Sequence, residues 1–464
     1  MKSQRPIQSR RLAGLAAAVA AAFALAGCMS LAPPYQAPAL ELPADQPLAG
    51  PANAPRWWTT SGDPVLAALV EEALAHNRDL LVAAARIEQA RAALGLARAD
   101  QLPDAGLQVE ANRSRDPVLF PQIINRFSTQ LAVSYQLDFW GKYRDATAAA
   151  REQLIAAEAN REALRLSLAS ELAQTWYGYQ ADTLRVAINE RTLAAQAQEL
   201  KLLRRRVAAG IAGEFELHQQ EAEVAATTVT LQLSIGARER GRNALGILLG
   251  RTPKAQVDGA LPEGGEIAGL PVPDSLPAGL PSQRLLNRPD VQAAEAALKA
   301  ANAQIGVARA AWFPDVALTA SGGSASRELS ALFSGGPSAF AIGAALIQPL
   351  FYGGRIASGI DAAEADRDAA VARYRQTVSQ AFREVLDALA ARRTAQVVAQ
   401  AEATRVAALG ETLRLARLRY LSGLTSQFEL LGNERSLLAA QGNLVEAKRG
   451  EAAAAVQLWT ALGG

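Results

Sequence analysis

The sequence predicts a mainly α-helical protein that carries a transmembrane β-barrel portion and is built as two tandem repeats. Two long stretches, 140–252 and 350–464, contain no proline. Because proline breaks helix interiors, each stretch can form long continuous helices. The first follows a segment in which apolar and polar residues alternate, the pattern of a strand with two different faces. The second follows a similar segment whose alternation is weaker, since both faces hold alanine and glycine. The same order therefore occurs twice: helix, two strands, long helix, turn, helix.

The first 27 residues predict a signal peptide. Four cations and no acidic residue accompany an apolar run that is short for a membrane span. The run Ser9-Arg10-Arg11 leaves open whether the general or the twin-arginine route is used. Without this segment the chain holds 43 basic and 45 acidic residues, so its charge does not indicate a nucleic-acid partner.

Cys28 is the only cysteine of the chain and directly follows Leu25-Ala26-Gly27. A small-residue triplet before a lone cysteine resembles the bacterial lipobox, which implies a thioether-linked lipid on Cys28 and cleavage before it. The next residue is Met29 and not aspartate, which resembles the outer-membrane sorting pattern. A buried structural cysteine is the alternative. We expect residues 28–62, rich in proline, to form an extended lipidated tether.

The first repeat is predicted over 63–250. Asp63 and Pro64 suit the N-cap and first position of a helix, which we expect to run to about Leu102. A β-hairpin follows at about 105–139, and its second strand is long enough for a tilted membrane crossing. A helical hairpin follows at about 142–249.

A proline-rich linker or equatorial region, 251–287, separates this unit from the second repeat at 288–464. There the β-hairpin is predicted at about 316–350 and the helical hairpin at about 355–462. The phrases "QLDFWGKYR" and "QPLFYGGR" occupy equivalent places, where a strand becomes a long helix. Aromatic residues gather at these strand ends, as in the interfacial girdle of membrane barrels. The predicted junction and girdle residues are Phe139, Trp140, Gly141, Trp312, Phe313, Phe351, Tyr352 and Gly353.

Four strands in one chain predict an oligomer. An open sheet edge in lipid would leave backbone groups unpaired, at a cost of several kcal/mol each. Two chains would supply eight strands, a barrel that side chains fill, whereas three would supply twelve and leave an aqueous lumen. A helical lipoprotein with two soluble hairpins is the alternative.

No enzyme is predicted, and neither a cofactor nor a metal site. The two histidines, His76 and His218, fall in different predicted helices, and no second thiol accompanies Cys28. The glycine clusters lack the lysine of a phosphate-binding loop.

Several phrases together resemble the TolC-like outer-membrane efflux factors, in the NodT-type lipoprotein branch that serves RND-type pumps. They are "DPVLAALVEEALAHNRDL", "LPSQRLLNRPDV", "QPLFYGGR", "RYLSGLTSQFELLGNERSL" and the closing "ALGG". The resemblance implies a homotrimer with a twelve-stranded barrel in the outer membrane above a periplasmic helical barrel. It implies a passive exit duct for drugs or other small toxic compounds, opened when a periplasmic adaptor and an inner-membrane pump dock.

The resemblance also implies roles for residues at the helical tips. Two turns match the loops that meet the adaptor. Phe428 stands where relatives have an apolar constriction, and Glu429 where some have an acid. Arg435 matches an arginine that relatives pair with an aspartate, but Gly432 replaces that aspartate, so Glu434 or Glu429 is expected to substitute. The turn residues are Gly210, Ile211, Ala212, Gly213, Gly423, Leu424, Thr425 and Ser426.

Two other functions remain open at this point. A duct of the same fold can serve type I protein secretion, although the lipobox argues against it by resemblance. A structural coiled-coil lipoprotein would make no pore.

Overall fold

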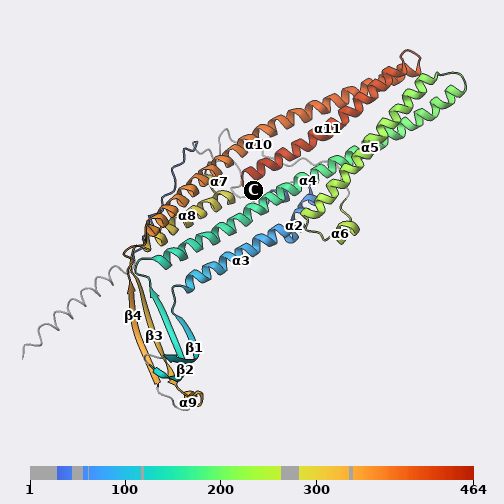
Figure 1. Ribbon diagram of the computed structural model, residues 1–464. Coiled ribbons are helices and arrows are strands. Elements are labelled where there is room, and N and C mark those ends of the chain that lie inside the picture. Colours follow the sequence, from blue (N-terminus) through green and yellow to red (C-terminus); the bar gives the residue numbers. More distant parts are fainter. Residues whose placement is uncertain are drawn as a thin grey trace, which may run out of the picture. The chain divides into compact units, whose positions relative to one another are not determined.

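The computed structural model describes residues 29–43, 56–60, 62–116, 120–262, 282–333 and 338–463 (Figure 1). The predicted signal peptide and Cys28 lie outside them, as does much of the linker. The described chain is mainly helical with a small antiparallel sheet, which confirms the predicted fold class. None of the described helices is both long and apolar enough to cross a membrane.

Contacts divide the chain into two compact units. One unit joins residues up to 40 with 85–158 and 292–376, and it contains the sheet. The other joins 41–84 with 159–291 and 377–464, and it contains the helical turns.

The sheet has four strands in the order β1-β2-β3-β4, all antiparallel. The strands are β1 (Asp104–Asp116), β2 (Phe120–Leu137), β3 (Asp315–Ser326) and β4 (Ser338–Ile347). The two predicted hairpins therefore lie side by side, because β2 pairs with β3. At this seam Gly323 lies against the backbone of Thr129, where a Cβ would come within 2.0 Å of the carbonyl oxygen.

Two long helices follow the hairpins, as expected. They are α4 (Lys142–Ala208) and α10 (Arg355–Leu421), each of 67 residues, or about 100 Å of continuous helix. The return helices are α5 (Glu214–Leu248) and α11 (Gln427–Ala461), each of 35 residues. The lengths of both pairs repeat to the residue, which indicates a duplicated unit.

The first predicted helix is wrong as a single element, because it breaks at Asn77. The chain forms α2 (Pro64–His76) and α3 (Arg78–Ala99) instead. Asn77 is extended, and its Oδ1 accepts hydrogen bonds from the backbone N–H of Asp79 and Leu80. Its Nδ2 donates to the carbonyl oxygen of Leu248. Asn77 thus caps a new helix and ties it to the end of α5.

The prediction of an extended tether is also wrong at the end of that segment, because Trp57–Thr60 forms a 3-10 helix, η1. Trp57 and Trp58 are buried in the core of the helical unit, together with Leu172 and Trp176. Asp63 caps α2 as predicted, through hydrogen bonds of 2.9 Å from the backbone N–H of Val65 and Leu66. The Trp176 indole also donates to Asp63, which joins the cap to α4.

Four further helices complete the described chain. The longest is α8 (Pro289–Ala310), which corresponds to α3 in the predicted repeat. The others are short and were not predicted from the sequence. They are α6 (Pro253–Asp258), α7 (Ser282–Leu286) and α9 (Leu329–Phe333).

Candidate functional site

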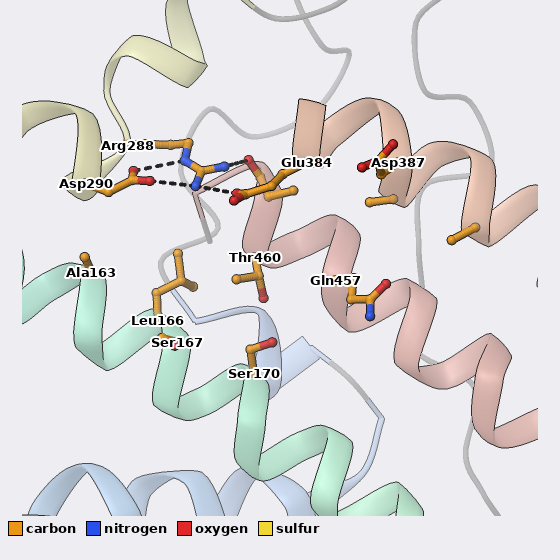
Figure 2. Close-up of a pocket in the computed structure, with 13 residues that line it drawn as sticks. Ala163, Leu166, Ser167, Ser170, Arg288, Asp290, Glu384, Asp387, Gln457 and Thr460 are labelled. Atoms are coloured by element: carbon orange, nitrogen blue, oxygen red, sulfur yellow. Dashed lines mark hydrogen bonds and ion pairs between the residues drawn. The ribbon is translucent and has the colours of Figure 1, made fainter. Parts of the chain in front are cut away.

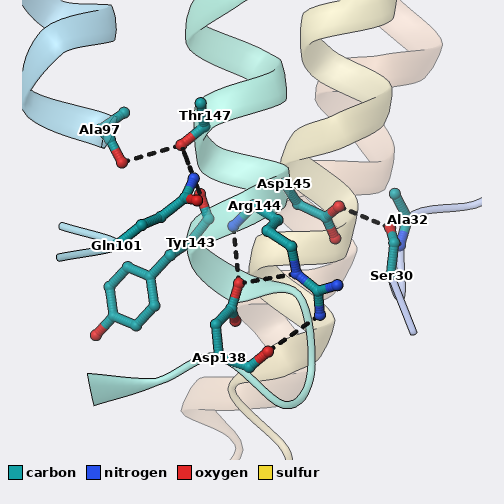
Figure 3. Close-up of polar contacts among 9 residues, drawn as sticks. All are labelled: Ser30, Ala32, Ala97, Gln101, Asp138, Tyr143, Arg144, Asp145 and Thr147. Atoms are coloured by element: carbon teal, nitrogen blue, oxygen red, sulfur yellow. Dashed lines mark hydrogen bonds and ion pairs between the residues drawn. The ribbon is translucent and has the colours of Figure 1, made fainter. Parts of the chain in front are cut away.

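The first strand-to-helix junction is built around a glycine with a left-handed backbone. Gly141 has φ of +76°, which glycine adopts without strain. Asp138 lies just before it and accepts hydrogen bonds from the backbone N–H and Nε of Arg144 (Figure 3). The Asp138 carboxylate therefore satisfies a free N–H at the start of α4, where negative charge is favourable.

The second junction reaches the same change of direction with two glycines. Gly353 and Gly354 have φ of +57° and +85°. The Arg355 N–H donates to the carbonyl oxygen of Tyr352, which closes the turn. The duplicated phrase thus marks both strand ends, and a glycine of positive φ provides each turn.

The predicted aromatic residues differ in their surroundings. Trp140 stacks on Phe313 with ring centroids 4.6 Å apart, and its indole N–H donates to the carbonyl oxygen of Pro314. Trp312, Phe351 and Tyr352 are exposed instead. Exposed aromatic side chains beside strand ends suit an interfacial environment.

The segment after Cys28 belongs to the sheet-containing unit and contacts its helices, which the sequence did not indicate. Ser30 Oγ donates to Asp145 Oδ1 at 2.6 Å (Figure 3). Gly306 makes room for this contact, because a Cβ there would lie 2.0 Å from Asp145 Oδ2. Burial raises the pKa of Asp145, and the hydrogen bond from Ser30 opposes that shift. Further along the segment, Asn302 donates to the Pro33 carbonyl oxygen.

The two helical turns share one backbone design. Gly210 and Gly423 have φ of +71° and +73°. At the first turn the N–H of Ile211 donates to Arg206 O, and at the second the N–H of Leu424 donates to Arg419 O. This six-to-one hydrogen bond, with glycine one residue earlier, is the Schellman motif that ends a helix. The tip turns therefore lie at the predicted positions.

The helices that leave the turns start differently. Gly213 precedes α5 without a side-chain cap, whereas Ser426 Oγ accepts a hydrogen bond from the Glu429 N–H before α11. The Thr425 hydroxyl also donates to the Glu429 carboxylate. Phe428, in the first turn of α11, is exposed.

The structure corrects the expected partner of Arg435. Among the described residues Arg435 pairs with Glu223 of α5, at 2.7 Å, and not with Glu429 or Glu434. Sequence reasoning missed Glu223 because it lies 212 residues earlier and belongs to the other repeat. The partner of Arg435 thus comes from another helix, α5.

Glu434 pairs with Arg417 of α10 at 3.2 Å. Arg417 also binds Glu199 of α4, at 2.5 Å, so that one guanidinium serves two carboxylates. Burial, together with the neighbouring Glu199 carboxylate, raises the pKa of Glu434 from 4.5 to about 7, although Arg417 opposes the rise. Glu434 therefore titrates near neutral pH.

A second polar centre surrounds Arg288, within the phrase "LPSQRLLNRPDV". Its guanidinium binds Asp290 at 2.8 Å, Glu384 at 2.7 Å and the carbonyl oxygen of Ala461 at 2.8 Å (Figure 2). The residues border a cavity of about 580 Å³. Because all three partners come from different elements, Arg288 ties the start of α8 to α10 and α11. No group of ligating side chains in the described part of the chain is arranged to hold a metal ion.

Comparisons with known proteins agree with this architecture. Residues 69–251 and 280–464 match the outer membrane efflux protein family. The chain is 35% identical to the antibiotic efflux pump outer membrane protein ArpC of Pseudomonas putida, covering 96% of this chain and 94% of that protein. It is 34% identical to the cation efflux system protein CusC of Escherichia coli K12, covering 96% and 97%.

A solved structure leads to the same family. The Campylobacter jejuni CmeC outer membrane channel superposes with a TM-score of 0.87 at 26% identity, covering 94% of this chain and 95% of that one. The matches extend over both hairpins and both helical turns. The chain therefore belongs to the outer membrane efflux protein family, with a TolC-like fold and a place in the bacterial outer membrane.

Proposed function

We propose that three copies of this chain form the passive exit duct of a tripartite RND-type efflux system. The observation that carries the proposal is the open sheet. Within the described residues β1 and β4 each pair on one side only. Every residue of β4 is exposed, including Phe340 at 84% and Ile342 at 83%. A long apolar strand with a free edge needs a partner, and closure with two further copies gives twelve strands.

We divide the duct into two repeats, 63–250 and 288–464, each supplying one hairpin to the barrel and one helical hairpin to the periplasmic barrel. The adaptor and pump dock at the turns 210–213 and 423–426. The exposed side chains of Ile211 and Leu424 support this assignment, because apolar groups at a tip suit a protein contact. The pump supplies the energy, and no catalytic step is assigned to this chain.

The resting gate uses residues of α11. Phe428, one turn beyond the second tip and exposed in the single chain, supplies an apolar constriction when three copies meet. Glu429 places a carboxylate beside it. Glu434 and Arg435 act differently, because each binds a helix of its own chain. They hold the tip helices together.

Cys28 carries the lipid anchor. The docking of Ser30 on Asp145 supports this role, because it holds the chain just after the cysteine. We expect Cys28→Ser to lose lipid labelling, and yet to leave the protein in the outer membrane, because strands provide the span. A variant that becomes wholly soluble would overturn the barrel.

The exported compounds are small toxic molecules. Relatives are named for antibiotics and for cations, and both classes are small. Deletion should reduce tolerance to antibiotics or metal ions and leave protein export intact. Purified protein should give stable conductance in planar bilayers. A loss of protein export with normal tolerance would favour type I secretion, and a lack of conductance would favour a structural lipoprotein.

A further inference from the structure

Five charged residues join the four helices that flank the two helical turns, which are α4, α5, α10 and α11. We call them the tip charge cluster. Arg417 on α10 contacts Glu199 on α4 and Glu434 on α11. Arg435 on α11 contacts Glu223 on α5. Each ion pair joins two different helices, so a pair breaks when α10 moves away from α4 or α11, or when α11 moves away from α5.

The cluster has an excess of one negative charge, because three carboxylates face two guanidinium groups. Glu223 and Glu434 are the most buried, with side chains 8% and 10% exposed. Glu223 has Arg435 to itself, whereas Glu434 shares Arg417 with Glu199. The uncompensated charge therefore falls on Glu434, which burial disfavours.

Two exposed arginines border the cavities beside the cluster. Arg191 borders the cavity next to Glu434, and its Nε donates to the Ala187 carbonyl oxygen. Arg206 borders the cavity next to Glu199. Both side chains lie largely in water, where screening limits their effect on a buried carboxylate.

A residue that borders the cavity beside Glu434 has a buried acceptor without a hydrogen bond in the described part of the chain. The cavity measures about 290 Å³ and is bordered by Gln196, whose side chain is 2% exposed. Gln196 Oε1 accepts no hydrogen bond from any described residue. A carboxylate cannot donate to it, but a protonated carboxyl group can. Gln196 and Glu434 border the same cavity, and only the protonated carboxyl group has a hydrogen to donate there.

We propose that Glu434 is a proton-operated latch, which holds α11 against α4 and α10 when protonated and loosens them when it loses its proton. The inference rests on the proposed duct, whose resting gate these helices form. A gate that tightens as the surrounding fluid acidifies would limit proton entry through an idle duct.

The direction follows from linkage. The packed tip binds the proton more tightly than a tip in which Glu434 reaches water, because its pKa is about 7 when packed and ordinarily 4.5. Packing is therefore favoured as pH falls from 7 toward 4.5, and the advantage is lost above 7. Between about pH 5.5 and 7.5 the ratio of open to packed tips should rise on the order of tenfold for each chain.

Hydrogen exchange of the full-length, detergent-solubilised protein tests the latch without requiring conductance. After correction for the intrinsic rate, amides of 413–434 should lose protection on the order of tenfold between about pH 5.5 and 7.5. Glu434→Gln should keep the high protection at both values. Its matched control is Glu221→Gln, at the equivalent position of the first repeat, which should behave as wild type.

Two further variants keep the proposal falsifiable. Glu199→Gln gives Glu434 sole use of Arg417, so the midpoint should move to lower pH. His218→Gln removes the histidine near the tip, which contacts Glu221 and not Glu434, and should leave the transition unchanged. Persistence of the transition in Glu434→Gln, or its loss in His218→Gln, would overturn the latch. Normal exchange behaviour in a protein that never conducts would instead overturn the duct.

Discussion

Two arginine–glutamate pairs occupy equivalent places in the two repeats, and they behave in opposite ways. Arg204 and Arg417 each lie six residues before a turn glycine, and Glu221 and Glu434 each lie eleven residues after it. The pairs are 2.9 Å and 3.2 Å long. Hydrogen bonds from Arg204 and His218 lower the pKa of Glu221, whereas burial raises that of Glu434.

Surroundings explain the difference. The Glu221 side chain is 36% exposed and has two basic neighbours, whereas Glu434 is 10% exposed and competes with Glu199 for one arginine. Water stabilises the charge of Glu221, but the helices around Glu434 do not. The two repeats therefore share the backbone of the turn and the arginine–glutamate pair. The burial of the glutamate decides whether its pKa is raised or lowered.

The largest effect is expected where a buried carboxylate loses its partner. Arg435→Ala leaves Glu223 buried and unpaired, and should lower the free energy of unfolding by about 2 kcal/mol. Chemical denaturation of the solubilised protein, followed by circular dichroism, measures this. Arg414→Ala breaks an exposed pair with Glu411 and should cost much less, because water screens the charges of that pair. Equal losses would show that burial does not distinguish these sites.

The two equivalent arginines give a smaller contrast. Arg417→Met should destabilise the protein by about 1 kcal/mol at pH 8, and less at about pH 5.5, where Glu434 is already protonated. Arg204→Met should cost less at both pH values, because its pair with Glu221 is exposed to water. The same denaturation experiment at both pH values compares them. A pH-independent loss in Arg417→Met would contradict the assigned state of Glu434.

Phe215 and Phe428 form another equivalent pair, and both are exposed in the single chain. We expect Phe428→Ala to raise the resting conductance of the reconstituted channel by a few-fold, because it removes an apolar barrier. Phe215→Ala should raise it less. If Phe428→Ala leaves the resting conductance unchanged, Phe428 is not part of the gate. If both variants raise the conductance equally, the two phenylalanines contribute equally to the gate.

The smallest effect concerns the helix starts. Ser426→Ala removes the cap of α11 and should cost about 0.5 kcal/mol, at the low end for caps because the hydrogen bond is 3.4 Å long. Gly213→Ala, at the uncapped start of α5, should change stability less. Thermal unfolding of the two variants compares them, and a larger loss in Gly213→Ala would contradict the assigned caps.

Much of the fold could be predicted from the sequence, because the signals are local. Proline-free stretches, alternation and turn glycines located both long helices, the hairpins and the two tips. The break at Asn77 was missed because its evidence is a contact with Leu248, far along the chain. The burial of Trp57 and Trp58 was also missed, because the proline-rich sequence around them suggested an extended segment. The residues that bury them, such as Leu172 and Trp176, are likewise distant in the sequence.

The candidate site was predictable only in part. Glycine spacing located the turns, but ion-pair partners depend on which helices pack together. In the sequence Glu434 or Glu429 was therefore the expected partner of Arg435, whereas Glu223 is its partner in the fold. Glu434 was identified from its position, whereas its raised pKa requires knowledge of burial and of Glu199.

Closure of the sheet by three copies is the central claim, and disulfide trapping tests it most directly. Cysteines can be placed in pairs on the two edge strands, at Leu107, Val109 or Ala111 of β1 and at Phe340, Ile342 or Ala344 of β4. The chain has one native cysteine, Cys28, whose proposed lipid blocks its thiol. Adjacent pairs should link chains of the membrane-inserted protein into trimers and no larger species. If the cross-linked species end at dimers, or if none of the cysteine pairs links two chains, the trimeric duct is contradicted.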